Sequence, residues 1–157
     1  MKLKHLAPHA LAIFSSAIFL DSLRYKFKNH PNTQEIFGRL DSWADGFGAG
    51  GIFSQSGLFS QYTIGAAELV ASALLLLGIL PALRRLQGLG ALLGIAVMSG
   101  AISFHLFTPL TTDPNNDGGG LFIMACCVWV SCLVLIISRR QQILAALCGL
   151  KAAIIGR

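Results

Sequence analysis

The chain has 157 residues, of which 54% are hydrophobic and only 12% are charged. A soluble domain carries about 25% charged residues, so this chain has too few to cover a globular surface in water, and a soluble all-helical protein is disfavoured. The net charge of +5 does not indicate nucleic-acid binding, because the basic residues are not gathered in one soluble segment but stand at the ends of apolar runs.

The first apolar run predicts a membrane-spanning helix over about residues 8–27, because its core, ALAIFSSAIFL, is continuous and Pro8 suits a first helical turn. Asp21 and Arg24 are three residues apart, so they share a helix face and can form an ion pair. A cleaved signal peptide is the alternative, since MKLKH suits the basic segment that precedes such a core. No clear cleavage site precedes Asp21, and a retained helix is therefore favoured.

The long connection that follows, residues 28–61, predicts an amphipathic helix over about 33–47. Its apolar side chains fall on one face at helical spacing: Ile36, Phe37, Leu40, Trp43 and Phe47. A helix of this kind suits the membrane interface or the end of a helix bundle. A glycine-rich stretch over 46–51 then ends it.

Three more apolar runs predict membrane spans over about residues 58–80, 86–107 and 121–138. The run at 86–107 contains four glycines, at spacings that let helices approach closely in lipid. Residues 143–155 predict a short amphipathic helix on the membrane surface. The predicted fold is therefore an all-α membrane protein: a single-domain four-transmembrane-helix bundle with one amphipathic helix in the long outer loop and another at the C-terminus.

Basic residues cluster at the N-terminus, at Arg84 and Arg85, and again from Arg139 to the C-terminus. The positive-inside rule places these three regions in the cytoplasm, and it places the long loop and the loop over 108–120 outside. We therefore expect a multi-pass protein of the bacterial inner membrane with both termini cytoplasmic.

Two ionisable residues in or beside the spans are candidates for chemistry, Glu68 in the second span and His105 near the end of the third. An ionisable side chain in a bilayer is costly and usually faces a partner, a cavity or a pathway. The predicted topology places both in the outer half of the bundle, where an acid and an imidazole can manage the protons of a bound quinone. The predicted site comprises Glu68 and His105 as catalytic residues and, as cofactor-binding residues, Arg24, Lys26, Tyr62 and Trp43.

Structural roles are the alternative for both candidate catalytic residues. Glu68 can form a salt bridge with Arg24 or Lys26, because charges in a membrane are paired by default. His105 can bond a backbone carbonyl near the rim of the membrane. Whether the two side chains meet depends on how the helices pack against one another, which one sequence does not reveal.

Other chemistries are disfavoured by the residue pattern. A b-type haem commonly takes two axial histidines at one depth, but His9 and His105 are expected on opposite sides of the membrane. The sequence has no metal-ligand spacing, P-loop or dinucleotide fingerprint, so neither a metal nor a nucleotide is expected. The four cysteines form no CxxC pair, which disfavours a thiol relay.

The stretch GAAELVASALLLLGILPALRRLQGLGALLGIAVMSGAISFHL, residues 65–106, resembles the DoxX-like family of small four-helix membrane proteins. The shared features are Glu68 early in a span, an apolar segment that ends in proline before a basic turn, and His105 at the end of the next span. The segment RYKF at 24–27 is similar to the basic, aromatic end of that family's first helix.

The resemblance covers most of residues 10–140 and implies a membrane subunit of an oxidoreductase system, such as a thiosulfate:quinone oxidoreductase or an oxidative-stress complex. Carried over by position, the matching polar sites are Lys26, Glu68 and His105. The chain departs from the family's pattern in its long outer loop, 29–61, and in its NNDGGG turn, which leaves substrate and partner open.

Three functions are compatible with these features. We expect first an integral membrane subunit of a quinone-linked redox system, with quinone as its cofactor. The alternatives are a non-enzymatic subunit that anchors or assembles a partner membrane protein, and a small proton-coupled transporter. The expected partners are membrane lipids and another membrane or peripheral subunit, with a homo-oligomer as a further option.

Overall fold

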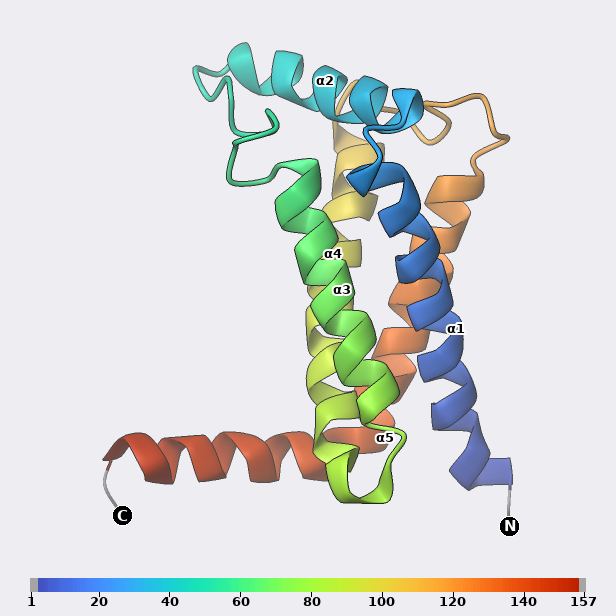
Figure 1. Ribbon diagram of the computed structural model, residues 1–157, viewed down its shortest axis with the longest axis vertical. Coiled ribbons are helices and arrows are strands. Elements are labelled where there is room, and N and C mark those ends of the chain that lie inside the picture. Colours follow the sequence, from blue (N-terminus) through green and yellow to red (C-terminus); the bar gives the residue numbers. More distant parts are fainter. Residues whose placement is uncertain (1–2, 156–157) are drawn as a thin grey trace.

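The computed structural model describes residues 3–155, and this part of the chain is helical with no strand. The helices in Figure 1 are α1 (Leu3–Phe27), α2 (Pro31–Asp45), α3 (Gln61–Leu77), α4 (Arg84–Phe107) and α5 (Gly120–Ile155), with a short 3-10 helix, η1 (Pro81–Leu83), before α4. Helices α1, α3, α4 and the first part of α5 run side by side, and α2 lies across one end of them (Figure 1). We call this end the α2 end, and we call the opposite end, where α4 begins, the Arg84 end.

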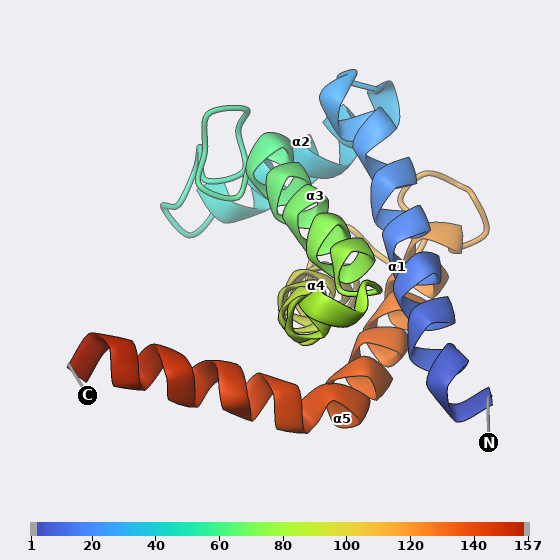
Figure 2. The same cartoon turned by 60° about the horizontal axis from the view of Figure 1, so that its bottom comes forward.

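The helices that run side by side form a ring in which each contacts two others. Extensive contacts join α1 to α3, α3 to α4, α4 to α5 and α5 back to α1. Figure 2 turns the ring so that its Arg84 end comes forward. In this ring α1 is diagonal to α4, and α3 is diagonal to α5. We call the line along which two neighbouring helices meet a seam, so the seam between α1 and α3 is separate from the seam between α4 and α5.

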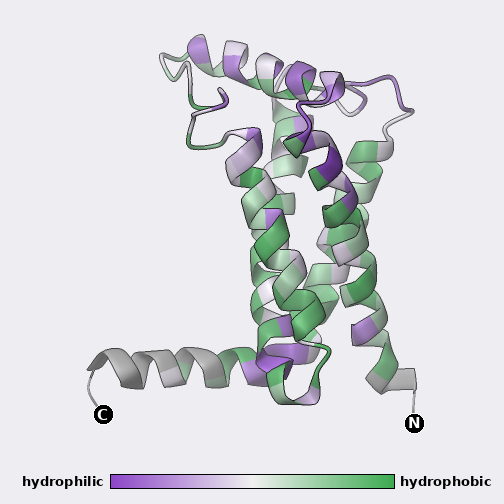
Figure 3. Ribbon diagram, viewed as in Figure 1, coloured by the Kyte–Doolittle hydropathy of each residue, from purple (hydrophilic) through white to green (hydrophobic). Residues whose placement is uncertain are grey.

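Three helical segments of the described chain are long and apolar enough to cross a membrane: Leu6–Phe27, Pro81–Phe107 and Gly120–Ala145. Only 28% of the most apolar window of each is buried, so most of their apolar surface faces outward. Figure 3 shows hydrophobic residues along these helices and hydrophilic residues concentrated on α2 and at the helix ends. Surfaces of this kind are stable in lipid rather than in water, and the chain is therefore a membrane protein.

Three glycines of α4 let it lie very close to its neighbours. A Cβ atom at Gly88 would come within 2.5 Å of Ile143 Cγ1 on α5. A Cβ atom at Gly90 would come within 2.8 Å of the backbone nitrogen of Leu75, and one at Gly94 would come within 2.8 Å of Cys132 Sγ. The predicted close approach is confirmed at these three positions, which join α4 to α3 and to α5. Gly100 is different, because a Cβ atom there would have no neighbour within 4 Å.

The second apolar run is helical over a shorter segment than the 58–80 expected from its hydropathy. Ser60 ends the preceding loop, because its side chain accepts a hydrogen bond from the Thr63 backbone N–H and so caps the start of α3. Gly78 ends the helix, and residues 79 and 80 lie in the turn before Pro81. Hydropathy extends into both flanks because the loop and the turn are apolar as well.

The fourth run continues where a break was predicted. α5 is one helix from Gly120 to Ile155, so the expected separate helix over 143–155 is wrong in its start. The segment between the two predictions, RRQQ, contains no glycine or proline, and arginine and glutamine are good helix formers. The last part of α5 turns away from the other helices (Figure 1). Its predicted amphipathic character concerns side chains that lie mostly outside the described residues.

Helix α2 occupies most of the segment predicted at 33–47, shifted toward the N-terminus. Pro31 occupies the first turn and His30 Nδ1 accepts a hydrogen bond from the Asn32 backbone N–H, which explains the earlier start. Leu40 and Ala44 are buried in a small core with Phe53 and Leu110. The prediction that Phe47 shares this apolar face is wrong: the helix ends at Asp45, and Phe47 is 75% exposed.

Candidate functional site

The candidate acid Glu68 forms an ion pair with Lys26 at the seam between α1 and α3. Lys26 Nζ lies 2.9 Å from both Oε1 and Oε2 of Glu68. The side chains are 13% exposed for Lys26 and 3% for Glu68, so the pair is almost completely removed from solvent. Lys26 also donates to Ser22 Oγ, one turn earlier on α1. The predicted salt bridge from Glu68 to a cation at the end of the first helix is confirmed, with Lys26 as the partner.

Two serines extend this polar region along the seam between α1 and α3, from Glu68 toward the Arg84 end. Ser72 Oγ donates to the Glu68 backbone carbonyl at 2.8 Å, and Ser16 Oγ donates to the Ser72 carbonyl at 3.4 Å. Both hydroxyls are buried, at 1% exposure each. Polar groups in such surroundings cost free energy unless they are bonded, so these contacts hold α1 and α3 in one register.

A buried amide lies between the ion pair and α2, and it was not identified from the sequence. Gln61 is 2% exposed, and its Nε2 donates to the Lys26 backbone carbonyl at 2.7 Å and to Asn29 Oδ1 at 2.6 Å. Its Oε1 accepts from Gln34 Nε2 of α2 at 2.6 Å. Gln61 is seven residues before Glu68, which places both on one helix face, and that spacing is the signal from which it could have been found.

His105 has separate partners at the seam between α4 and α5. Its Nδ1 lies 2.6 Å from the Thr111 backbone oxygen, and its ring packs edge-on against Phe122 with centroids 5.7 Å apart. The predicted bond to a backbone carbonyl is confirmed. The structure brings Lys26 to Glu68, and no hydrogen bond of Glu68 within the described part of the chain reaches His105.

The other predicted site residues also have their own contacts. Arg24 pairs with Asp21 at 2.9 Å, as its spacing predicted, and the side chains are 71% and 56% exposed. Tyr62 donates its hydroxyl to Asn29 Oδ1 at 2.7 Å, which adds it to the Gln61 network. Trp43 packs edge-on against Phe47, with ring centroids 5.3 Å apart. Neither Arg24 nor Trp43 contacts the ion pair through a hydrogen bond among the described residues.

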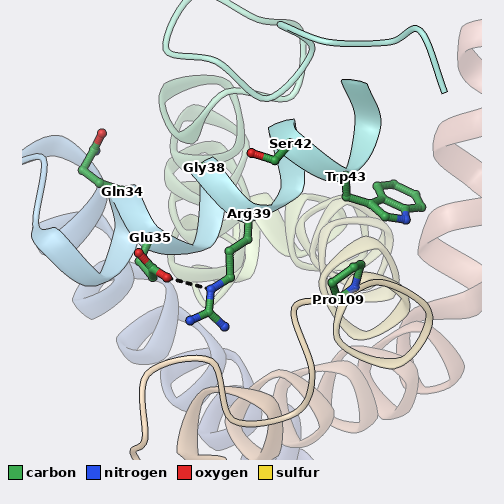
Figure 4. Close-up of a pocket in the computed structure, with 7 residues that line it drawn as sticks. All are labelled: Gln34, Glu35, Gly38, Arg39, Ser42, Trp43 and Pro109. Atoms are coloured by element: carbon green, nitrogen blue, oxygen red, sulfur yellow. Dashed lines mark hydrogen bonds and ion pairs between the residues drawn. The ribbon is translucent and has the colours of Figure 1, made fainter. Parts of the chain in front are cut away.

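An open hollow lies beside α2, as Figure 4 shows. Its volume is about 580 Å³, and its lining residues are Gln34, Glu35, Gly38, Arg39, Ser42, Trp43 and Pro109. Arg39 Nε donates to Glu35 Oε1 at 2.7 Å across one turn of the helix. Gly38 has no side chain, which leaves the hollow open at that position, and Trp43 provides an aromatic wall. Glu68 and His105 do not line this hollow.

A second buried amide, also missed in the sequence, lies at the Arg84 end. Gln87 of α4 is completely buried; its Oε1 accepts from Arg139 Nε at 2.8 Å, and its Nε2 lies 3.4 Å from His9 Nδ1. Gln87 therefore connects α4 to α5 and to α1. Among the described residues, no group of three histidine, cysteine, aspartate or glutamate side chains gathers as a metal site would require.

Comparison with known proteins found no matching family model, no matching curated protein and no matching solved structure. Function therefore has to be inferred from the contacts and charges of the chain itself.

Proposed function

We propose that the chain is a four-span subunit of the bacterial inner membrane that anchors or assembles a partner protein. The observation that carries this proposal is the open hollow at the α2 end, lined by Arg39, Glu35 and Trp43. Arginine and tryptophan are the residue types that most often dominate binding energy at protein interfaces. The ionisable residues expected to perform chemistry, Glu68 and His105, are instead bonded within the chain, at two different seams.

The proposed topology treats α3 as the fourth span. Its 17 residues give a length of about 25 Å at 1.5 Å per residue, slightly less than the roughly 30 Å of a hydrocarbon core. Extensive contacts with α1 and α4 support its inclusion in the bundle. With the Arg84 end in the cytoplasm, as the positive-inside rule requires, both termini are cytoplasmic and α2 faces the outer aqueous side.

A photo-crosslinking experiment in native membranes tests the anchoring role. A photoreactive residue at Ser42 lies in the hollow, and one at Ser56 serves as a control, because it is exposed in the loop between α2 and α3 and does not line the hollow. We expect a discrete crosslinked partner from Ser42 that is weakened when Trp43→Ala or Arg39→Ala is added. Equal products from Ser42 and Ser56, or products indifferent to Trp43→Ala, would contradict the proposal.

The second candidate function is the quinone-linked redox subunit, and the buried pair of Lys26 and Glu68 favours it. Replacing a buried ion pair by apolar residues is often neutral or stabilising, so a pair retained inside a membrane protein calls for a role beyond stability. Lys26 is the more exposed member; its three N–H donors go to Glu68 and Ser22, and a quinone carbonyl would replace the Ser22 hydroxyl as one of these acceptors.

Quinone content distinguishes the two candidates. Protein purified in mild detergent with native lipid is extracted and assayed for quinone by mass spectrometry, alongside Glu68→Gln at matched folding. Near-stoichiometric quinone in the wild type and its loss in Glu68→Gln would favour the redox subunit. Equal background in both proteins would exclude a quinone site that depends on Glu68.

A further inference from the structure

Charge is distributed very unequally between the two ends of the bundle. All seven acidic residues of the chain lie between Asp21 and Asp117, and none lies in the segments 1–20, 69–112 or 118–157. These acid-free segments build the Arg84 end, where α1 begins, α3 ends, α4 begins and α5 leaves the ring (Figure 1). The arginines at that end, Arg84, Arg85, Arg139 and Arg140, therefore have no carboxylate nearby in sequence.

Ion pairing in the described residues follows the same division. The three salt bridges join Arg24 to Asp21, Lys26 to Glu68 and Arg39 to Glu35, all toward the α2 end. At the Arg84 end the described residues form no salt bridge. Among the described residues, no carboxylate pairs with the cations at that end.

Two of these arginines lie on the same side of the Arg84 end, because Arg84 is one turn before Gln87 on α4 and Gln87 binds Arg139. Arg139 is fixed by its Nε hydrogen bond to the buried Gln87, while the described residues offer no hydrogen bond to its two Nη groups. A Cβ atom at Gly88, next to Gln87, would come within 3.4 Å of Arg139 Cβ, so this part of α5 packs directly against the first turns of α4, which begin at Arg84. Like charges repel, so an arrangement that holds them together is stabilised by an anion between them.

The surroundings indicate which anion is suitable. Large apolar side chains at the same end remain exposed, with Leu80 at 52% and Leu144 at 59%. A soluble anion makes no use of such surface, whereas the acyl chains of a lipid cover it. Guanidinium groups bind phosphate oxygens in a bidentate manner, and basic residues at the membrane surface recognise anionic lipids.

We propose that Arg84 and Arg139 form a binding site for the phosphate of an anionic phospholipid, with the acyl chains against the adjacent leucines of α3–η1 and α5. Gln87 acts as a positioning residue, because it fixes the Arg139 guanidinium at the seam between α4 and α5. This inference does not depend on the anchoring or redox role, since it concerns the opposite end of the molecule.

Lipid binding to the whole protein tests the proposal. Delipidated protein in neutral detergent is titrated with phosphatidylglycerol and with phosphatidylcholine of the same acyl chains, and bound lipid is resolved by native mass spectrometry. We expect phosphatidylglycerol to bind at least fivefold more tightly, and Arg84→Gln to weaken it about fivefold, the effect of one basic residue near an anionic headgroup. Equal affinity for the two lipids would overturn the proposal.

Two further variants make the result specific. Arg24→Gln removes the same charge at the other end of α1, where Arg24 is paired with Asp21, and it should leave the phosphatidylglycerol affinity unchanged. Arg139→Lys keeps the charge but loses the planar fork, so it should weaken phosphatidylglycerol binding less than Arg84→Gln. An equal loss in Arg24→Gln and Arg84→Gln would show that only net charge matters and would contradict a site. Arg84 is exposed, so its replacement is compatible with folding.

Discussion

Each end of the bundle has a buried glutamine that joins neighbouring helices, but among the described residues the two ends differ in whether their cations are paired with carboxylates. At each end a buried glutamine joins three elements: Gln61 connects α3 with α2 and the end of α1, and Gln87 connects α4 with α5 and α1. At the α2 end the cation Lys26 has its counter-ion, Glu68, inside the fold. At the Arg84 end, the described residues supply no counter-ion for Arg139.

The α2 end satisfies its polar and charged groups within the described part of the chain, whereas the Arg84 end does not. A polar network that is satisfied internally stabilises the fold in any surroundings, whereas an uncompensated cluster of cations depends on what the membrane supplies. The α2 end is therefore expected to respond to substitutions within the chain, and the Arg84 end to the lipid composition.

The largest effect is expected from breaking the internal pair. Lys26→Met leaves the Glu68 carboxylate buried without a counter-charge, and the free energy of unfolding should fall by about 3–5 kcal/mol. The double variant Lys26→Met with Glu68→Met removes both charges and should recover most of that loss. Thermal unfolding in detergent measures both; a double variant no more stable than Lys26→Met would show that the charge pair is not the cause.

A smaller effect should separate the two glutamines. Gln61→Leu removes three hydrogen bonds, although Asn29 Oδ1 keeps the one from Tyr62, so the free energy of unfolding should fall by roughly 1–3 kcal/mol. Gln87→Leu should cost less, because Gln87 makes one short hydrogen bond, to Arg139, and one longer contact, to His9. Parallel unfolding curves check the order, and a larger loss from Gln87→Leu would reverse the ranking of the two ends.

The smallest expected changes in the free energy of unfolding have opposite signs at the two ends of the bundle. Asp21→Asn removes an exposed ion pair with Arg24, which contributes at most about 1 kcal/mol. Arg84→Gln, in neutral detergent without anionic lipid, should instead be neutral or slightly stabilising, because it relieves repulsion from Arg139. Added phosphatidylglycerol should stabilise the wild type more than Arg84→Gln. Equal thermal shifts in the two proteins would argue against a role for Arg84.

The elements that sequence could predict are those governed by local physics. Helix ends at Phe27 and Phe107, the ion pair of Asp21 and Arg24, and the close approach at Gly90 follow from chain-local hydropathy, from three-residue spacing and from side-chain size. The continuous course of α5 past Ser138 was missed because a hydropathy window ends where charged residues begin, although the helix itself does not.

By itself the sequence determined that this is an all-helical membrane protein and that Glu68 needs a partner, because apolar length and the cost of a buried charge are independent of how helices assemble. Only the tertiary structure decided that the partner is Lys26 rather than Arg24, that His105 belongs to another seam, and that Gln61 and Gln87 are connectors. Those outcomes depend on the order of helices around the ring and on the rotation of each about its axis. Both are set by packing between segments that are distant in the chain.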